Sequence, residues 1–134
     1  MERDRLLRLA RWGDEFARPG FSFGEWVPAR KDEAGVIHMG WYEQNEVAVR
    51  FVGDMYQLGF VHAFDWMTWL GTPEGKRFRR GPEAVATAGA DDLARLLTAI
   101  IRGERFSDGE LAGAHESGIL LAIARRAGEL AEGT

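Results

Sequence analysis

The sequence predicts a mainly α-helical protein, a compact multi-helix single domain with a small β-hairpin near its N-terminus. The chain has 134 residues, which is the usual size of one domain. Its composition, 46% hydrophobic and 28% charged, is typical of a globular protein with its own core. The most regular stretch, residues 93–126, repeats apolar residues every three or four positions, the period of a helix that buries one face.

The N-terminal segment is expected to form a helix over residues 2–18. Leu6, Leu9 and Phe16 recur at the spacing that places side chains on one face of a helix. The dipeptide 19–20 is Pro-Gly, which ends a helix because proline clashes with the preceding turn and glycine favours irregular backbone.

A hairpin is expected over residues 21–42. Its two halves are rich in aromatic and β-branched residues and partly alternate, as strands do. In the second half Ile37, Met39 and Trp41 would share one face, with His38 on the other. Because a two-stranded hairpin is only marginally stable alone in water, we expect this one to lie against a helix.

Residues 44–130 are expected to be helical, in several segments separated by turns. An apolar stripe over residues 44–58 ends at Gly59, a residue that favours the left-handed backbone found after helices. Residues 93–101 and 119–130 carry the broadest apolar faces, so we expect them to build the core. Between these long helices, capping residues and prolines predict short helices or turns.

The strongest local signal is a helix start at residues 107–110. Ser107 and Glu110 match the S-x-x-E capping box, and Phe106 and Leu111 stand where a hydrophobic staple would place them. We therefore expect the Ser107 hydroxyl to cap this helix and to contribute about 1 kcal/mol to stability.

The composition argues against several classes of protein. The net charge of −4 argues against a general polyanion binder. The chain has no cysteine, which excludes disulfides and thiolate metal sites and fits a cytoplasmic protein. The charged N-terminus is unlike a secretory signal, and no apolar run approaches the roughly 18 residues of a membrane span. Motifs of serine hydrolases, zinc proteases and phosphate-binding loops are missing, so we expect no cofactor.

One cluster of ionisable residues is a candidate active site. Arg102 and Arg105 lie in the turn before the capping box, and His115 and Glu116 lie on the helix after it. These four side chains would form a cleft in which the arginines hold an anion and His115 or Glu116 moves a proton. The same residues also fit structural ion pairs and helix caps, with a half-buried histidine, and we favour this structural interpretation.

Two further candidates lie in residues 62–69. Phe64, Trp66 and Trp69 could form an aromatic patch that stacks on a base, although aromatic residues at this spacing more often belong to the core. His62 and Asp65 could supply two metal ligands. Because Asp65 is well placed to cap a short helix, and nothing in the spacing demands a metal, we expect none.

A basic loop at residues 76–80 is the candidate for nucleic-acid binding. Lys76, Arg77, Arg79 and Arg80 surround one phenylalanine, a composition that suits phosphate contacts. The alternative, which we favour, is a solvated loop whose charges are balanced by nearby glutamates.

The sequence from about Trp41 to Arg126 resembles an uncharacterised bacterial domain family, domain of unknown function 6508. The N-terminal part up to about Gly40 looks less typical of that family. Because the family has no established activity, the resemblance implies a small single domain and no catalytic residue. The most specific shared segments are Phe64-Asp65-Trp66, Leu97-Thr98, Arg102, Arg105-Phe106, Gly109, Leu111, Glu116-Ser117-Gly118 and Arg125-Arg126.

These observations favour a small cytoplasmic, non-enzymatic binding or regulatory module that acts through an unknown protein partner or through self-association. The basis is the absence of catalytic signatures. Two alternatives stay open: an enzyme or small-anion binder that uses the arginine, histidine and glutamate cleft, and a nucleic-acid binder that uses the basic loop. A membrane is not an expected partner.

Overall fold

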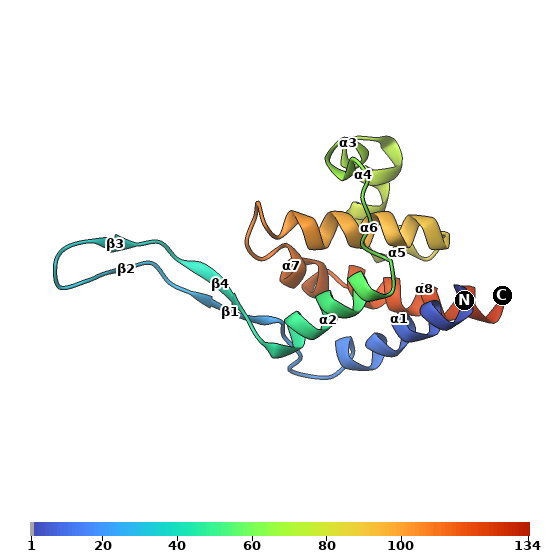
Figure 1. The fold of residues 1–134 in the computed structure, drawn as a ribbon, viewed down its shortest axis with the longest axis horizontal. Coiled ribbons are helices and arrows are strands. Elements are labelled where there is room, and N and C mark those ends of the chain that lie inside the picture. The colour runs from blue at the N-terminus through green and yellow to red at the C-terminus, as the bar shows by residue number, and fades with distance from the viewer. Residues whose placement is uncertain (1) are drawn as a thin grey trace.

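The structure is a computed structural model that describes residues 2–134, and it confirms a mainly α-helical fold with strands near the N-terminus (Figure 1). The helices are α1 (Glu2–Phe16), α2 (Glu46–Gln57), α3 (Trp66–Leu70), α4 (Pro73–Arg80), α5 (Pro82–Val85), α6 (Ala90–Gly103), α7 (Glu110–Glu116) and α8 (Ile119–Glu132). The strands are β1 (Gly24–Val27), β2 (Arg30–Lys31), β3 (Ile37–His38) and β4 (Trp41–Gln44).

One hydrophobic core joins the helices, and α6 and α8 lie at its centre as predicted. Leu97 and Leu120 are fully buried, together with most apolar residues of these two helices. Helix α1 packs closely along α8 because small residues face each other: a Cβ added at Gly13 would lie 3.3 Å from the Ala124 Cβ. Among residues 2–134, no helix combines the length and apolar character needed to cross a bilayer.

Several predicted boundaries shift by a few residues. Helix α1 ends at Phe16 rather than residue 18, since the residue before Pro19 is disfavoured in helical backbone. Helix α2 begins at Glu46 because the Asn45 side chain caps it, accepting a hydrogen bond from the Ala48 N–H at 3.0 Å. Gln44, expected to open that helix, is instead the last residue of β4.

The prediction of a basic loop at residues 76–80 is wrong, because this segment is the second half of helix α4. Thr72 caps the helix, accepting a hydrogen bond from the Gly75 N–H, and Pro73 occupies the first turn. Phe78 is buried, and three arginines in the last turn lie where the helix dipole favours cations. Burial of one aromatic side chain and the dipole together explain why a charged segment is helical.

The hairpin spans residues 24–44 rather than 21–42, and it does not lie against a helix along its length. Residues 24–44 form one two-stranded antiparallel ribbon, β1 with β4 and then β2 with β3. Figure 1 shows this ribbon extending away from the helices, with only its base near them. We call residues 24–44 the arm.

The close contact of α1 with α8 predicts different effects of alanine at two helical glycines. At Gly53 an added Cβ meets open space, so Gly53→Ala should raise the free energy of unfolding by about 0.5–1 kcal/mol through helix propensity. At Gly13 the added Cβ presses on Ala124, so Gly13→Ala should gain less or destabilise. Urea unfolding measures both, and equal gains would contradict the packing described.

Candidate functional site

The arm has two chemically different faces. The pairing of Val27 with Trp41 and the pairing of Arg30 with His38 have the same register, so the two pairs of strands share one alternation of faces on either side of residues 28–29 and 39–40. Even-numbered residues therefore share one face, which includes Trp26, Tyr42 and the His38–Asp32 pair at 2.8 Å. Odd-numbered residues share the opposite face, which we call the free face.

The free face is mainly apolar and exposed to solvent. Ile37 is 67% exposed, Met39 78% and Trp41 42%, and Val27 is half-buried beside them. This arrangement agrees with the predicted placement of these three residues opposite His38. A continuous exposed apolar surface of this kind is unusual on a monomeric protein and commonly marks a contact site.

The even face of the arm rests on a turn between α6 and α7, residues 104–109, which we call the elbow. The Tyr42 N–H donates to Asp108 Oδ2 at 3.2 Å. The Trp26 ring lies on Gly109, where an added Cβ would be 2.6 Å from the indole. Gly109 also has a φ of 92°, so glycine is required there both by the backbone and by the ring above it.

The elbow is held by Glu104 and not by the predicted capping box. The Glu104 carboxylate accepts hydrogen bonds from the Gly109 N–H at 2.8 Å and the Leu111 N–H at 2.9 Å. Helix α7 begins only at Glu110, after the left-handed Gly109, so Ser107 is too far from the helix start to cap it. The predicted hydrophobic staple is also wrong, since Phe106 is 72% exposed while Leu111 is buried.

A groove of about 470 Å³ lies where the base of the arm meets the helices. Trp41 and Glu43 of the free face line it on one side, and Tyr56 of α2 and Arg105 lie on the other. Tyr42 borders it, and burial together with the nearby Glu116 and Glu104 carboxylates raises the pKa of its phenol. The groove therefore continues the free face into the helical part of the molecule.

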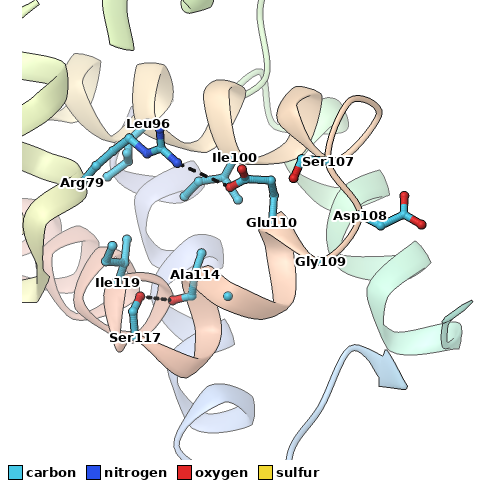
Figure 2. A pocket seen from close by; sticks show the side chains of 11 residues that line it. Arg79, Leu96, Ile100, Ser107, Asp108, Gly109, Glu110, Ala114, Ser117 and Ile119 are labelled. Carbon is cyan, nitrogen blue, oxygen red and sulfur yellow. Dashed lines mark hydrogen bonds and ion pairs between the residues drawn. The ribbon is translucent and has the colours of Figure 1, made fainter. Parts of the chain in front are cut away.

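A second cavity, of about 340 Å³, lies on the other side of α7 between that helix and α6 (Figure 2). Arg79 Nη2 and Glu110 Oε2 are 3.6 Å apart there, and Figure 2 shows these side chains pointing toward one another. Because the two charges offset each other, the cavity holds a paired arginine rather than a free cation.

The four residues of the predicted cleft lie in different surroundings. Arg105 lines the groove. Arg102 lies in the last turn of α6, with its Nε buried and without a hydrogen-bond partner among residues 2–134. His115 packs beside phenylalanines, with its ring centroid 4.8 Å from that of Phe21. Glu116 is exposed and close enough to influence Tyr42.

The residues of the segment 62–69 are engaged in local structure. The His62 ring stacks on Phe64 at 4.8 Å, and the Asp65 carboxylate caps α3 by accepting from the Thr68 N–H. The hydrogen bond from the Thr68 hydroxyl also lowers the pKa of Asp65. Phe64, Trp66 and Trp69 are half-buried. Among residues 2–134, no group of three or more potential metal ligands comes together.

The cations of helix α4 differ in their partners. Arg77 donates to the Thr87 hydroxyl at 3.2 Å and lies over the Phe78 ring, and Arg79 pairs with Glu110. Lys76 and Arg80 are exposed. The segment therefore has two side chains bound within the protein and two directed to solvent.

A family model described as a family of unknown function, DUF6508, matches residues 1–133. The match includes the N-terminal part, which looked less typical of the family from sequence. No curated protein and no solved structure matches the chain. The site is therefore interpreted from its own geometry.

The contacts in the elbow predict that two substitutions change the free energy of unfolding by different amounts. Glu104→Ala should lower the free energy of unfolding by about 1–3 kcal/mol, because two N–H groups lose their carboxylate acceptor. Ser107→Ala should change it by less than about 0.5 kcal/mol, because the Ser107 side chain is exposed and caps nothing. Thermal and urea unfolding measure both values. A larger loss of stability from Ser107→Ala than from Glu104→Ala would show that the capping box forms.

Proposed function

Because the chain belongs to the DUF6508 family, whose function is unknown, we propose from its structure that it is a small non-enzymatic binding module that acts through protein contacts. The arm is its contact surface. The observation that carries the proposal is the distribution of exposed large apolar residues. Of nine such residues among residues 2–134, five lie on the arm: Trp26, Val36, Ile37, Met39 and Trp41.

Physical considerations support a protein as the partner. An exposed apolar surface gains free energy when another apolar surface covers it. Among residues 2–134 each strand of the arm has one neighbouring strand, so the outer edge of β1 is open to a partner chain. The elbow fixes the base of the arm through Asp108 and Gly109, so binding loses little conformational entropy in ordering the arm.

The two alternative functions receive less support. An anion-binding cleft would need Arg102, Arg105, His115 and Glu116 to converge, whereas His115 packs on Phe21 and Arg105 lines the groove. Nucleic-acid binding through α4 would need free cations, and Arg79 is paired with Glu110, while the net charge of −4 disfavours a polyanion partner. We also propose a bacterial cytoplasm as the compartment, since a cysteine-free chain suits a reducing environment.

The proposal predicts position-specific capture of a protein. A photo-crosslinking amino acid placed at Met39 should give a protein adduct when cells expressing the chain are irradiated, because Met39 would be covered by the partner. The same group at Met67 is a matched control, because Met67 is 56% exposed but lies on α3, which Figure 1 shows apart from the arm. Mass spectrometry identifies the adduct. Equal labelling at both positions, or none at Met39, would refute the arm as contact surface.

A further inference from the structure

The charges of the free face differ between the base and the tip of the arm. At the base, Glu25 and Glu43 stand directly opposite each other in the β1–β4 register, an arrangement of like charges that destabilises a ribbon. Both are exposed, and neither forms an ion pair among residues 2–134. Near the tip, the same face carries Lys31, which is exposed and likewise has no carboxylate partner in that range, and the exposed Glu33 follows it in the turn.

The two glutamates at the base and Lys31 near the tip are related by a regular spacing. The centre of the arm is the level of Pro28 and Gly40, between the β1–β4 and β2–β3 pairs. Glu25 lies three residues before Pro28, and Lys31 lies three residues after it. On the other strand, Trp41 and Met39 lie one residue on either side of Gly40. A two-fold axis through this level, across the two strands, therefore brings Lys31 of one copy to Glu25 of the other, and Met39 of one copy to Trp41 of the other.

From this spacing we infer that the partner of the arm is a second copy of the chain. The free faces of the two arms pack on each other, antiparallel, about a two-fold axis at the level of Pro28 and Gly40. The inference rests on the proposed function and names the occupant of its contact surface. In such a dimer each residue contact occurs twice, so one face must supply both halves of every pair.

Two of the pairs that this arrangement creates are chemically complementary. Lys31 of one copy comes over Glu25 of the other, which relieves the repulsion between Glu25 and Glu43. The Met39 thioether comes over the partner's Trp41 ring, a favourable contact of sulfur with an aromatic. Ile37, the apolar residue beside Lys31, reaches the partner's Glu43 and the groove behind it, whose apolar lining includes Tyr56. The tip of each arm thus ends in the groove of the other copy.

The groove can accept side chains of a partner, but β4 cannot pair with an added strand at Tyr42. The Tyr42 N–H, which points away from β1, is already bonded to Asp108. A partner strand could not use that donor, so extension of the sheet along β4 is blocked at this position. Packing of face on face, at the spacing of about 10 Å that is usual for stacked sheets, uses no backbone donor and remains open.

Single cysteines test the axis, because the native chain contains none. Ala29, next to the axis, lies close to its own symmetry mate, so Ala29→Cys should yield a covalent dimer with a short bismaleimide. Ala34 at the tip lies six residues from the axis, which separates the two copies of this position by roughly 40 Å. Ala34→Cys is the matched control, exposed like Ala29, and should remain monomeric.

The charge pair supplies a second test in the Ala29→Cys background. Lys31→Glu should reduce the yield of covalent dimer about tenfold, because two like-charge contacts form at each interface. Adding Glu25→Lys to Lys31→Glu should restore the yield by exchanging the charges. Because Glu25→Lys also places a cation opposite Glu43 within the arm, the single variant Glu25→Lys is the control. It should reduce the yield as Lys31→Glu does, whereas a gain in the stability of the arm alone would raise it.

The outcomes separate this inference from the proposed function. Cross-linking of Ala29→Cys and not of Ala34→Cys, with rescue by the charge exchange, supports the two-fold dimer. Cross-linking through position 34, failure of both variants to cross-link, or no rescue overturns it. If the dimer fails while photo-crosslinking at Met39 captures a different protein, the proposed function stands and the second copy is excluded as partner.

Discussion

The carboxylate of Glu104 is the interaction on which the placement of the arm depends. By accepting the Gly109 and Leu111 N–H groups, it closes the elbow after α6 and sets where α7 begins. The closed elbow presents Gly109 to the Trp26 ring and Asp108 to the Tyr42 N–H. One side chain in the helical domain therefore fixes the base of a ribbon that has few other contacts with it. This anchoring leaves the opposite face of the ribbon uncovered.

Much of the fold could be predicted from the sequence because burial dominates it. The apolar periodicity of α6 and α8 identified the core, and alternation placed Ile37, Met39 and Trp41 on one face. The elbow was mispredicted because Ser107 and Glu110 have the spacing of a capping box, and spacing alone does not decide which oxygen accepts the N–H groups at the helix start. The Glu104 carboxylate accepts the Gly109 and Leu111 N–H groups instead, and the left-handed Gly109 moves the helix start to Glu110.

The candidate site could be predicted only in part. Local pattern indicated which side of the arm is apolar, but whether a helix covers that side depends on the direction in which the ribbon leaves the core. Charged residues were a weaker guide. In the basic segment, Arg77 and Arg79 bind Thr87 and Glu110 of the same chain. The inferred partner contact instead uses Glu25 and Lys31, which belong to no sequence motif. Their significance appears only once the register defines which residues share a face.

Sedimentation velocity of the wild-type chain beside the double variant Ile37→Glu and Met39→Glu tests the central claim most directly. Both side chains are exposed, so the variant should keep the helical fold of the wild type, which circular dichroism checks. A dimeric wild type and a monomeric variant are expected, with Met67→Glu, on the exposed surface of α3, still dimeric as the control. A wild type that sediments as a monomer at every concentration, or a double variant that remains dimeric, would contradict it.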